Sequence, residues 1–499
     1  MNNKHRDFII FLIIYGIFLI ISCWNLPITE STEGRYAEIA REMLRSWNFL
    51  EPTFQGIYHF HKPPFAYWMM CLGMKIFGIN DFGPRIGGIL ASIISIIYVY
   101  RIAGLWLKEN KDQFLVALIF ASSGLFLLEA HVIATDIYLC TFILMAQFYI
   151  FNAKNKARPF LLGILLALGF LTKGPIILLF TVFPFIITAL FKKEYFKYFK
   201  LKEYFIIIFL SLSLGLSWYV YVCLKHQGLL EYFLGIQVYD RVFTDHFGRT
   251  EAWYYFIFCF ILSFFPYSIA FFNAIKNIKK NYFPKELLFF IIFPAIIFQL
   301  SMSKLSSYIL PFYGLASLIA FYGIPDNLKK YIKYFAYLII LGFTFILLIF
   351  SIFGEYYINH DRFHKIKCLG KFKFFTSIIN KIDPEKKEDL LIYSWNLPSM
   401  SFYRDKLAYT ANYEKREILF EKSNSLGLKH YLDTDEKLNN FIKEREKFFL
   451  VCHNYRIEDT KDNKCELELM EQYSINCKHL SGKLKHNYQL YECFQYKLL

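Results

Sequence analysis

The sequence predicts a polytopic α-helical membrane protein that ends in a small outer domain. First, 56% of its 499 residues are hydrophobic and 20% are aromatic, more than in an ordinary soluble domain. Second, apolar runs of roughly 20 residues, the length a helix needs to cross the hydrocarbon core, recur from Phe8 to Phe353. Third, the composition turns polar near Gly354, which predicts a membrane domain at 1–353 and an extracytoplasmic C-terminal domain at 354–499.

Eleven segments are predicted to span the bilayer. They lie at about 8–25, 82–105, 113–129, 133–152, 159–172, 174–191, 204–224, 254–272, 286–302, 307–324 and 331–353. The stretch at 64–78 is also helix-like, so about 11 to 13 transmembrane helices are expected. The first span is longer than a signal-peptide core and no A-x-A-like site follows it, so we expect an uncleaved anchor.

Basic residues are concentrated before the first span and in the short connections after alternate spans. They are Lys4, Arg6, Lys108, Lys111, Lys154, Lys156, Arg158, Lys192, Lys193, Lys279, Lys280, Lys329 and Lys330. By the positive-inside rule these segments face the cytoplasm, and the connections at 26–81 and 225–253 and the tail face outward. The net charge of +15 therefore indicates topology in a lipid bilayer and no nucleic-acid partner.

The first outer loop is predicted to begin with an amphipathic helix of about three turns, starting at Glu33. Its apolar positions are Tyr36, Ile39, Ala40, Met43 and Leu44. The helix is too short and too polar to cross the bilayer, so we expect it in the outer interface with its apolar face towards the membrane. Taken alone, this helix favours a structural interpretation, in which Glu33 complements the helix dipole and Arg41 and Arg45 are solvated.

The following segment "HFHKPPFAYW", at 59–68, changes that balance. Pro63 and Pro64 hold Lys62 extended, and a fixed lysine beside a membrane suits an anionic head group, because a mobile side chain loses more entropy on binding. His59 and His61 are two residues apart and share one face of an extended chain. They fit the beginning of a metal site, but zinc sites generally need three or four protein ligands.

Further charged and polar residues gather at the expected outer ends of later spans. They are Asp136, Lys173, Arg241, Asp245, His246, Arg249, Lys304 and Tyr308. Ionisable groups near a bilayer are costly unless they are paired or functional. Each alone fits an interfacial anchor, which is the favoured interpretation for Lys173 and Arg249. Together they indicate a cationic pocket with carboxylates, which suits a site that binds a phosphate and also needs a base.

The C-terminal domain is predicted to be a small α/β or α+β fold without a catalytic motif. Expected strands lie at 390–395, 448–453 and 488–494, and expected helical stretches at 414–422 and 435–446. Its five cysteines either remain free or form disulfides, for which the candidate pairs are Cys452 with Cys465 and Cys477 with Cys493.

Five motifs occur in order along the chain: "TEGRYAEIAREM", "HKPPFAYW", "ATDIYL", "LTKGP" and "SKLSSYILP". With them, residues 7–325 resemble the bacterial polyprenyl-phosphate-dependent glycosyltransferases of the GT-C class. The likeness is strongest to the lipid A aminoarabinose transferases and their relatives in the protein O-mannosyltransferase superfamily. It implies a bacterial inner-membrane enzyme whose active site and C-terminal domain face the periplasm.

Such enzymes move one sugar from a polyprenyl (undecaprenyl) phosphate to lipid A, another envelope glycan or a protein, and they use no nucleotide cofactor. The resemblance implies base roles for Glu33 and Asp136, with Glu30 substituting for the family's leading acid, which Thr32 replaces here. It implies that Lys62 contacts the lipid phosphate and that His61 contacts a divalent metal such as zinc, for which the spacing of the two histidines makes His59 the second candidate ligand. Residues implied to bind the lipid phosphate or sugar are Arg35, Tyr36, Lys62, Arg241, Lys304 and Tyr308.

A single displacement with inversion is the expected chemistry, because it requires only a base and a stabilised leaving group. The alternatives are a transporter or flippase, a phosphoethanolamine-type transferase and a noncatalytic receptor. A lipid or sugar transporter or flippase without transfer activity usually shows repeated halves, which are not evident here. A phosphoethanolamine-type transferase needs metal ligands in its soluble domain. A noncatalytic receptor needs only a binding surface on the tail.

Overall fold

The computed structural model describes residues 5–30, 32–152, 156–245, 248–278, 283–359, 371–393, 396–411, 429–453, 475–480 and 488–495. The chain separates into two units. We call the first the membrane unit; it comprises Met1–Trp24, His61–Met69 and Arg85–Leu348. We call the second the sheet unit; it comprises Asn25–Phe60, Met70–Pro84 and Ile349–Leu499. Helices α3 (Phe65–Phe77) and α19 (Asp326–Asn359) begin in the membrane unit and end in the sheet unit, and the short η2 (Gly83–Arg85) begins in the sheet unit and ends in the membrane unit.

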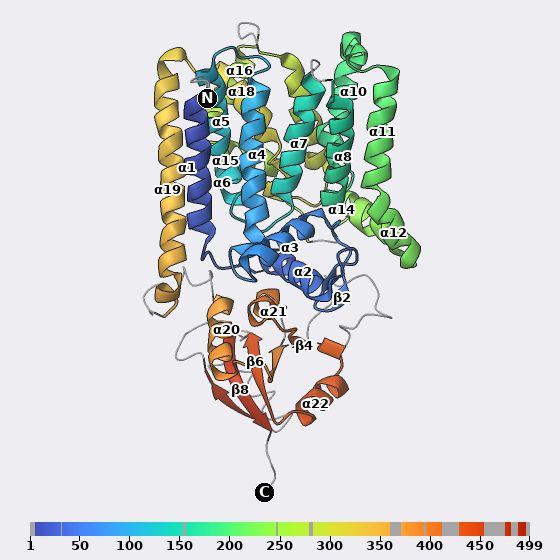
Figure 1. Ribbon diagram of the computed structural model, residues 1–499, viewed down its shortest axis with the longest axis vertical. Coiled ribbons are helices and arrows are strands. Elements are labelled where there is room, and N and C mark those ends of the chain that lie inside the picture. Colours follow the sequence, from blue (N-terminus) through green and yellow to red (C-terminus); the bar gives the residue numbers. More distant parts are fainter. Residues whose placement is uncertain are drawn as a thin grey trace. The chain divides into compact units, whose positions relative to one another are not determined.

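The membrane unit is a bundle of helices (Figure 1). Its longer helices are α1 (Arg6–Cys23), α4 (Ile86–Ala103), α5 (Asn110–Ala121), α7 (Asp136–Phe151), α8 (Arg158–Lys173), α10 (Val182–Phe191), α11 (Leu201–Gly215), α16 (Tyr267–Lys276), α17 (Phe289–Leu300), α18 (Phe312–Gly323) and α19 (Asp326–Asn359). Shorter helical segments are η2 (Gly83–Arg85), α6 (Gly124–Glu129), α9 (Ile176–Phe180), η3 (Lys193–Tyr198), α12 (Ser217–Lys225), α13 (Leu229–Glu231), η4 (Tyr232–Asp240), α14 (Arg241–Phe243), α15 (Tyr255–Ser263), η5 (Lys285–Leu288) and η6 (Ser306–Ile309).

The predicted fold class is confirmed, and each expected span corresponds to one helix or to consecutive helices. Four helical stretches of the described chain are long and apolar enough to cross a membrane: Arg6–Cys23, Gly83–Ala103, Leu201–Lys225 and Asp326–Ser351. The expected single span at 254–272 is instead two helices, α15 and α16, which are bent by 113°. Pro266 stands at the start of α16 and has no N–H to continue the preceding helix, which accounts for the break.

Close helix contacts in the membrane unit depend on small residues. Gly163 on α8 faces α11, and a Cβ there would lie 2.8 Å from the Leu210 Cβ. Polar side chains pair inside the bundle, as where Ser95 and Thr141 join α4 to α7 at 2.8 Å. Both features are expected of helices that associate without a hydrophobic driving force between them.

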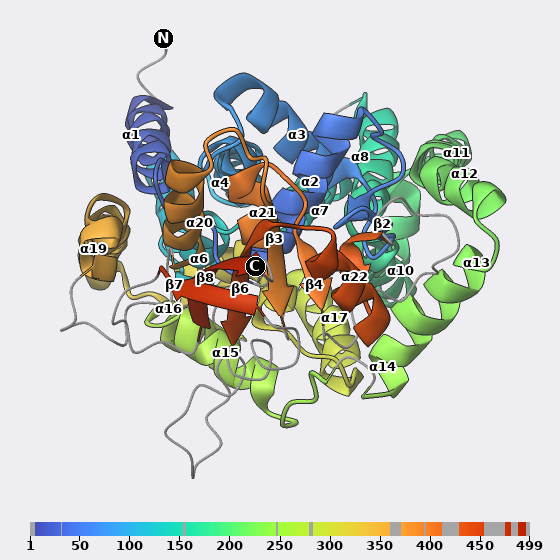
Figure 2. The same cartoon turned by 90° about the horizontal axis from the view of Figure 1, so that it is seen from below.

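The sheet unit contains one six-stranded sheet. Its strands are β3 (Asp389–Tyr393), β4 (Tyr409–Ala411), β5 (Tyr431–Leu432), β6 (Lys447–His453), β7 (Ile475–His479) and β8 (Tyr488–Gln495). Their order is β5-β4-β3-β6-β8-β7, and most of this row is visible in Figure 2. The first four in that order pair in parallel, whereas β8 is antiparallel to both β6 and β7.

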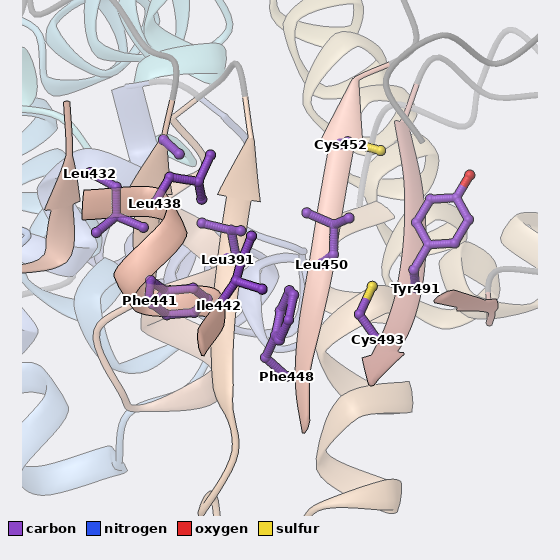
Figure 3. Packing of buried hydrophobic residues seen from close by; sticks show 11 residues of the cluster. Leu391, Leu432, Leu438, Phe441, Ile442, Phe448, Leu450, Cys452, Tyr491 and Cys493 are labelled. Atoms are coloured by element: carbon purple, nitrogen blue, oxygen red, sulfur yellow. The ribbon is translucent and has the colours of Figure 1, made fainter. Parts of the chain in front are cut away.

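Helices cover both faces of this sheet. The alternation of β6 sends Phe448 and Leu450 to one face and Phe449 and Val451 to the other. On the first face, shown in Figure 3, they pack with residues of α22 (Asp435–Lys443), including Phe441. On the second face the cluster includes residues of α20 (Lys371–Ile382) and α21 (Pro398–Arg404).

The sequence located this domain's main elements. The three expected strands correspond to β3, β6 and β8, and the helix expected at 435–446 corresponds to α22. The stretch at 414–422 and Cys465 lie outside the described residues. The expected Cys477–Cys493 disulfide is present and joins residues directly opposite each other on β7 and β8.

The first outer loop also belongs to the sheet unit. It supplies α2 (Thr32–Ser46) and a small hairpin of β1 (Thr53–Phe54) and β2 (Ile57–Tyr58). The contacts therefore group residues 25–60 and 70–84 with the C-terminal region, although more than 250 residues of sequence separate them. The sequence boundary at 354 marks a change in composition and does not describe this grouping.

A buried ion pair inside the sheet unit gives a stability test. Arg404 is almost fully buried and contacts Asp383 at 2.6 Å. We predict that Arg404→Ala destabilises the protein by about 3 kcal/mol, because Asp383 would keep a buried charge with its cationic partner removed. Thermal unfolding of the purified protein in detergent measures this change. Lys387→Ala is the control, since the Lys387–Glu385 pair is exposed and should contribute little. Equal loss in both variants would contradict the prediction.

Candidate functional site

Glu33 and Glu30 lie at the beginning of α2 in the sheet unit. The Glu33 Oε2 atom accepts hydrogen bonds from the Thr29 backbone N–H at 2.9 Å and the Thr29 hydroxyl at 2.7 Å. The Glu30 Oε1 atom accepts the Ser399 backbone N–H at 2.9 Å. Burial raises the pKa of Glu30 to about 8 despite the hydrogen bonding from Ser399, and the charges of Glu38 and Glu33 add to the rise. Glu30 is therefore able to hold a proton near neutral pH.

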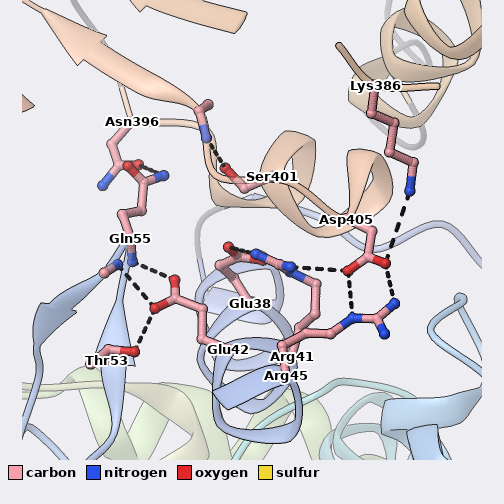
Figure 4. Close-up of polar contacts among 12 residues, drawn as sticks. Glu38, Arg41, Glu42, Arg45, Thr53, Gln55, Lys386, Asn396, Ser401 and Asp405 are labelled. Carbon is pink, nitrogen blue, oxygen red and sulfur yellow. Dashed lines mark hydrogen bonds and ion pairs between the residues drawn. The ribbon is translucent and has the colours of Figure 1, made fainter. Parts of the chain in front are cut away.

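The rest of α2 is buried on most sides, so the expectation of a helix with one apolar face in the membrane interface is wrong. Its residues from Glu33 to Met43 are all buried. Arg41 and Arg45 were expected to be solvated, but both contact Asp405, and Arg41 also binds Glu38 at 2.7 Å (Figure 4). Arg41 therefore meets the C-terminal region with its side chain buried, whereas the Arg45 side chain stays 58% exposed while it contacts Asp405.

Three other predicted residues also belong to the sheet unit. Arg35 and Tyr36 are buried neighbours on α2, and the Arg35 guanidinium lies 5.6 Å from the Tyr36 ring centroid. His59 is buried after the hairpin, where its backbone N–H donates to the Pro52 carbonyl at 2.8 Å and its ring lies 5.4 Å from that of Phe54.

His61 and Lys62 belong to the membrane unit. The His61 ring stacks on Tyr232 with centroids 6.0 Å apart. The Tyr232 hydroxyl accepts from Gln237 at 2.7 Å, and Gln237 accepts from Arg241 at 2.8 Å. This chain of contacts links the segment that carries Lys62 to Arg241.

Asp136 and Lys173 form a buried ion pair in the membrane unit. Asp136 is the first residue of α7 and Lys173 is the last residue of α8, and their charged atoms lie 2.5 Å apart. The Lys173 ammonium is also 4.8 Å from the centre of the Tyr308 ring. These three residues line one small cavity. The interpretation of Lys173 as an interfacial anchor is therefore wrong.

Lys304 lies on a short segment that contacts the Arg241 region and also carries Tyr308 of the Asp136 and Lys173 cavity. Its backbone N–H donates to the Arg249 carbonyl at 3.0 Å, and its buried ammonium donates to the Glu251 carbonyl at 3.3 Å. One residue earlier, the Ser303 N–H donates to the Arg241 carbonyl at 3.1 Å. Because Tyr308 follows four residues later, a single short segment holds the Arg241 region beside the Asp136 and Lys173 cavity.

The predicted site residues thus fall in two groups. The membrane unit contains His61, Lys62, Asp136, Arg241, Lys304 and Tyr308. The sheet unit contains Glu30, Glu33, Arg35, Tyr36 and His59. Asp245 accepts a hydrogen bond from the Thr250 hydroxyl, and His246 lies outside the described residues.

Tyr232 and Gln237 were missed by sequence reasoning. They are five residues apart on η4, a π-helical segment, where residues at i and i+5 share a face. A search for α-helical spacing does not detect such a pair. Lys173 did have a signal, since it occurs in "LTKGP", but its partner Asp136 is 37 residues away.

The described residues do not provide a metal-binding cluster. No group of three or more His, Cys, Asp or Glu side chains among them is placed to hold a metal ion. His59 and His61 pack against different aromatic rings. The zinc expectation stays a prediction.

Comparisons with known proteins identify the fold. Residues 61–221 match the family described as dolichyl-phosphate-mannose-protein mannosyltransferase. A solved structure, ArnT from Cupriavidus metallidurans bound to undecaprenyl phosphate, superposes with a TM-score of 0.80 at 15% identity over 98% of both chains. The chain has the GT-C fold.

Sequence relatives agree with this GT-C assignment. The chain is 26% identical over 60% of its length to undecaprenyl phosphate-alpha-4-amino-4-deoxy-L-arabinose arabinosyl transferase 2 of Pseudomonas fluorescens. It is 27% identical over 60% of its length to the transferase of the same name in Proteus mirabilis. The alignments cover 53% and 56% of these relatives' own lengths, respectively. The resemblance to GT-C aminoarabinose transferases inferred from the motifs is confirmed.

The raised pKa of Glu30 predicts a pH-dependent effect of Glu30→Gln on stability. A carboxyl whose folded pKa of about 8 exceeds its ordinary value of 4.5 favours folding while neutral, and this contribution is lost as the pH rises through 8. The always neutral glutamine loses nothing. We therefore expect the melting temperature of Glu30→Gln, minus that of the unmodified protein, to increase from pH 4.5 to pH 8 and then level off. Glu385→Gln, at an exposed position, is the control. A difference that is constant with pH would contradict the prediction.

Proposed function

We propose that this GT-C protein is a glycosyltransferase that moves one sugar from a polyprenyl phosphate, such as undecaprenyl phosphate, to an acceptor in the bacterial envelope. The carrying observation is the buried ion pair of Asp136 and Lys173, which lines a small cavity with Tyr308 in the same unit as Lys62, Arg241 and Lys304. The similarity to arabinosyl transferases and the fold shared with ArnT support the same class. The acceptor is lipid A, another envelope glycan or a protein.

The donor's phosphate is both the handle by which it is held and the leaving group. As the glycosidic bond breaks, negative charge grows on the phosphate oxygens. Lys62, Arg241 and Lys304 are the cations assigned to this charge, and fixed cations stabilise the transition state more than the ground state. Lys304 is well suited, because its ammonium is already held by a backbone carbonyl and needs little reorganisation.

A carboxylate takes the proton from the acceptor hydroxyl, and Glu33 and Asp136 are the two candidates. The hydroxyl oxygen forms a bond to the anomeric carbon while the bond from that carbon to the phosphate oxygen breaks on the opposite face. One displacement of this kind inverts the anomeric centre. Lys173 pairs with Asp136 at 2.5 Å and fixes the position of its carboxyl group, which supports either a base role or a role in orienting the acceptor.

An outward-facing reaction accounts for a lipid-linked donor, because soluble nucleotide sugars are not expected outside the cytoplasmic membrane. The basic connections predict a cytoplasmic location for the opposite ends of the spans. We therefore propose that the site and the sheet unit face the periplasm of a bacterial inner membrane. A transporter or flippase is the alternative, and it differs in producing no glycosylated acceptor.

Glu33→Gln and Asp136→Asn test the base. Each is expected to lower transfer by roughly 100-fold or more, the usual contribution of a positioned base. The measurement is transfer of radiolabelled sugar from polyprenyl phosphate to envelope acceptors in vesicles that contain the purified protein. Asp326→Asn is the control, because that carboxylate is 95% exposed at the start of α19. Full activity in both test variants would remove both base assignments.

Lys62→Ala tests the phosphate contact. We expect the donor KM to rise by roughly 10-fold or more, the effect of losing about 1.4 kcal/mol of binding, because a charge-assisted contact to phosphate is lost. Lys62→Arg should restore part of it. Lys276→Ala removes an exposed lysine of the same unit and should change nothing. A donor KM that is the same in all variants would contradict the role of Lys62.

A further inference from the structure

We propose that the C-terminal region of the sheet unit positions the catalytic helix, with Asp405 as the positioning residue that fixes α2. This inference rests on the proposed function, because α2 matters for transfer only if Glu33 takes part. The C-terminal region carries no catalytic motif, yet its helix α21 packs along α2. The contacts at both ends of α2 support a positioning role.

The first turn of α2 is fixed against the beginning of α21. Glu30, just before α2, accepts the Ser399 backbone N–H at 2.9 Å. A Cβ at Gly34 would lie 2.5 Å from the Glu30 Oε2 atom and 3.1 Å from the Ser399 nitrogen. No larger residue fits there without displacing α21. Glu33, the neighbour of Gly34, therefore lies beside a close approach of α2 and α21.

The last turns of α2 are fixed at the other end of α21. Asp405 accepts from the Arg41 guanidinium at 3.0 Å and from the Arg45 Nε at 3.0 Å (Figure 4). Arg41 also donates two hydrogen bonds of 2.7 Å to Glu38, one turn earlier on α2. The Arg41 side chain is 5% exposed, so this interaction is shielded from solvent. One carboxylate thus holds two turns of the helix.

Asp405 lies at the end of α21 with φ 52, in the left-handed region. Glycine is the usual residue at such a helix end, and aspartate and asparagine adopt this conformation less often. An aspartate here places a carboxylate at the end of α21, where it binds Arg41 and Arg45.

The hairpin after α2 adds a second connection. Glu42 of α2 accepts from the Thr53 hydroxyl at 2.5 Å and from the backbone N–H groups of Gln55 and Gly56 at 2.6 and 2.9 Å. The Gln55 side chain in turn donates to Asn396 at 3.0 Å and accepts from Thr410 at 3.1 Å. Residues of the C-terminal region therefore hold α2 directly and also through this hairpin.

These contacts hold α2 in a fixed position relative to the C-terminal region of the sheet unit. A reacting group displaced by about 1 Å can lose roughly 100-fold in rate, so loosening α2 should lower kcat. The cations assigned to the donor phosphate belong to the membrane unit and keep their own contacts. Loosening α2 should therefore leave the donor KM unchanged.

Asp405→Asn and Asp405→Gly test the proposal. Asparagine tolerates the left-handed conformation and glycine prefers it, so neither variant adds backbone strain, and both remove the carboxylate. Glu492→Gln is the matched control, because Glu492 is a buried acid of the same sheet that pairs with Lys447 instead of α2. Each full-length protein is reconstituted in vesicles. Amide hydrogen exchange of residues 33–46 and the kcat and donor KM of transfer are measured.

The proposal expects faster exchange in α2 and a kcat lowered by roughly 10-fold or more in both Asp405 variants, with donor KM and the control unchanged. Exchange in α2 equal to that of the unmodified protein would overturn it. Faster exchange with an unchanged kcat would also overturn it, since α2 would then be held without consequence for the reaction. If the unmodified protein transfers no sugar, the proposed function fails, while the exchange measurement still decides whether Asp405 fixes α2.

Discussion

The structure depends on one constraint, that every charge removed from water needs a partner. In the sheet unit this constraint acts on α2, where Arg41 is shared between Glu38 and Asp405. In the membrane unit it acts on Asp136 and Lys173, which meet at the ends of two neighbouring helices. Breaking a buried pair by removing one partner is strongly unfavourable, so each pair fixes the position of the elements that carry it. The polar residues of the candidate site are therefore also those that determine its local geometry.

Much of the fold was predictable because it follows from local patterns. Apolar length located the spans, and alternation located β3, β6 and β8. Pro266 can be seen in the sequence as a residue that interrupts a helix. The 113° bend between α15 and α16 could not be predicted from it, because a bend angle depends on packing against residues far away in the sequence. Short strands such as β5, with two residues, give too little pattern to detect.

The candidate site was predictable only in part, because some of its residues contact partners that lie far away in the sequence. The motifs identified Asp136 and Lys62 because each lies in a recognisable stretch of sequence. They did not identify the partner of Asp136, since Lys173 looked the same as a lysine at a membrane surface. The burial of α2 was also missed: its charges match those of a solvated helix, and its partner Asp405 lies 364 residues from Arg41.

That separation has a consequence for biosynthesis. At roughly 5–20 residues per second, a ribosome needs on the order of 20 to 70 seconds to make the chain between Arg41 and Asp405. During this time α2 exists without the surface that later covers it. If the face of α2 that the C-terminal region covers were apolar, it would bind lipid or other chains during this time. Arginine and glutamate side chains on that face keep it hydrated instead. The charged residues of α2 thus suit a helix that meets its partner surface only after the C-terminal region has been synthesised.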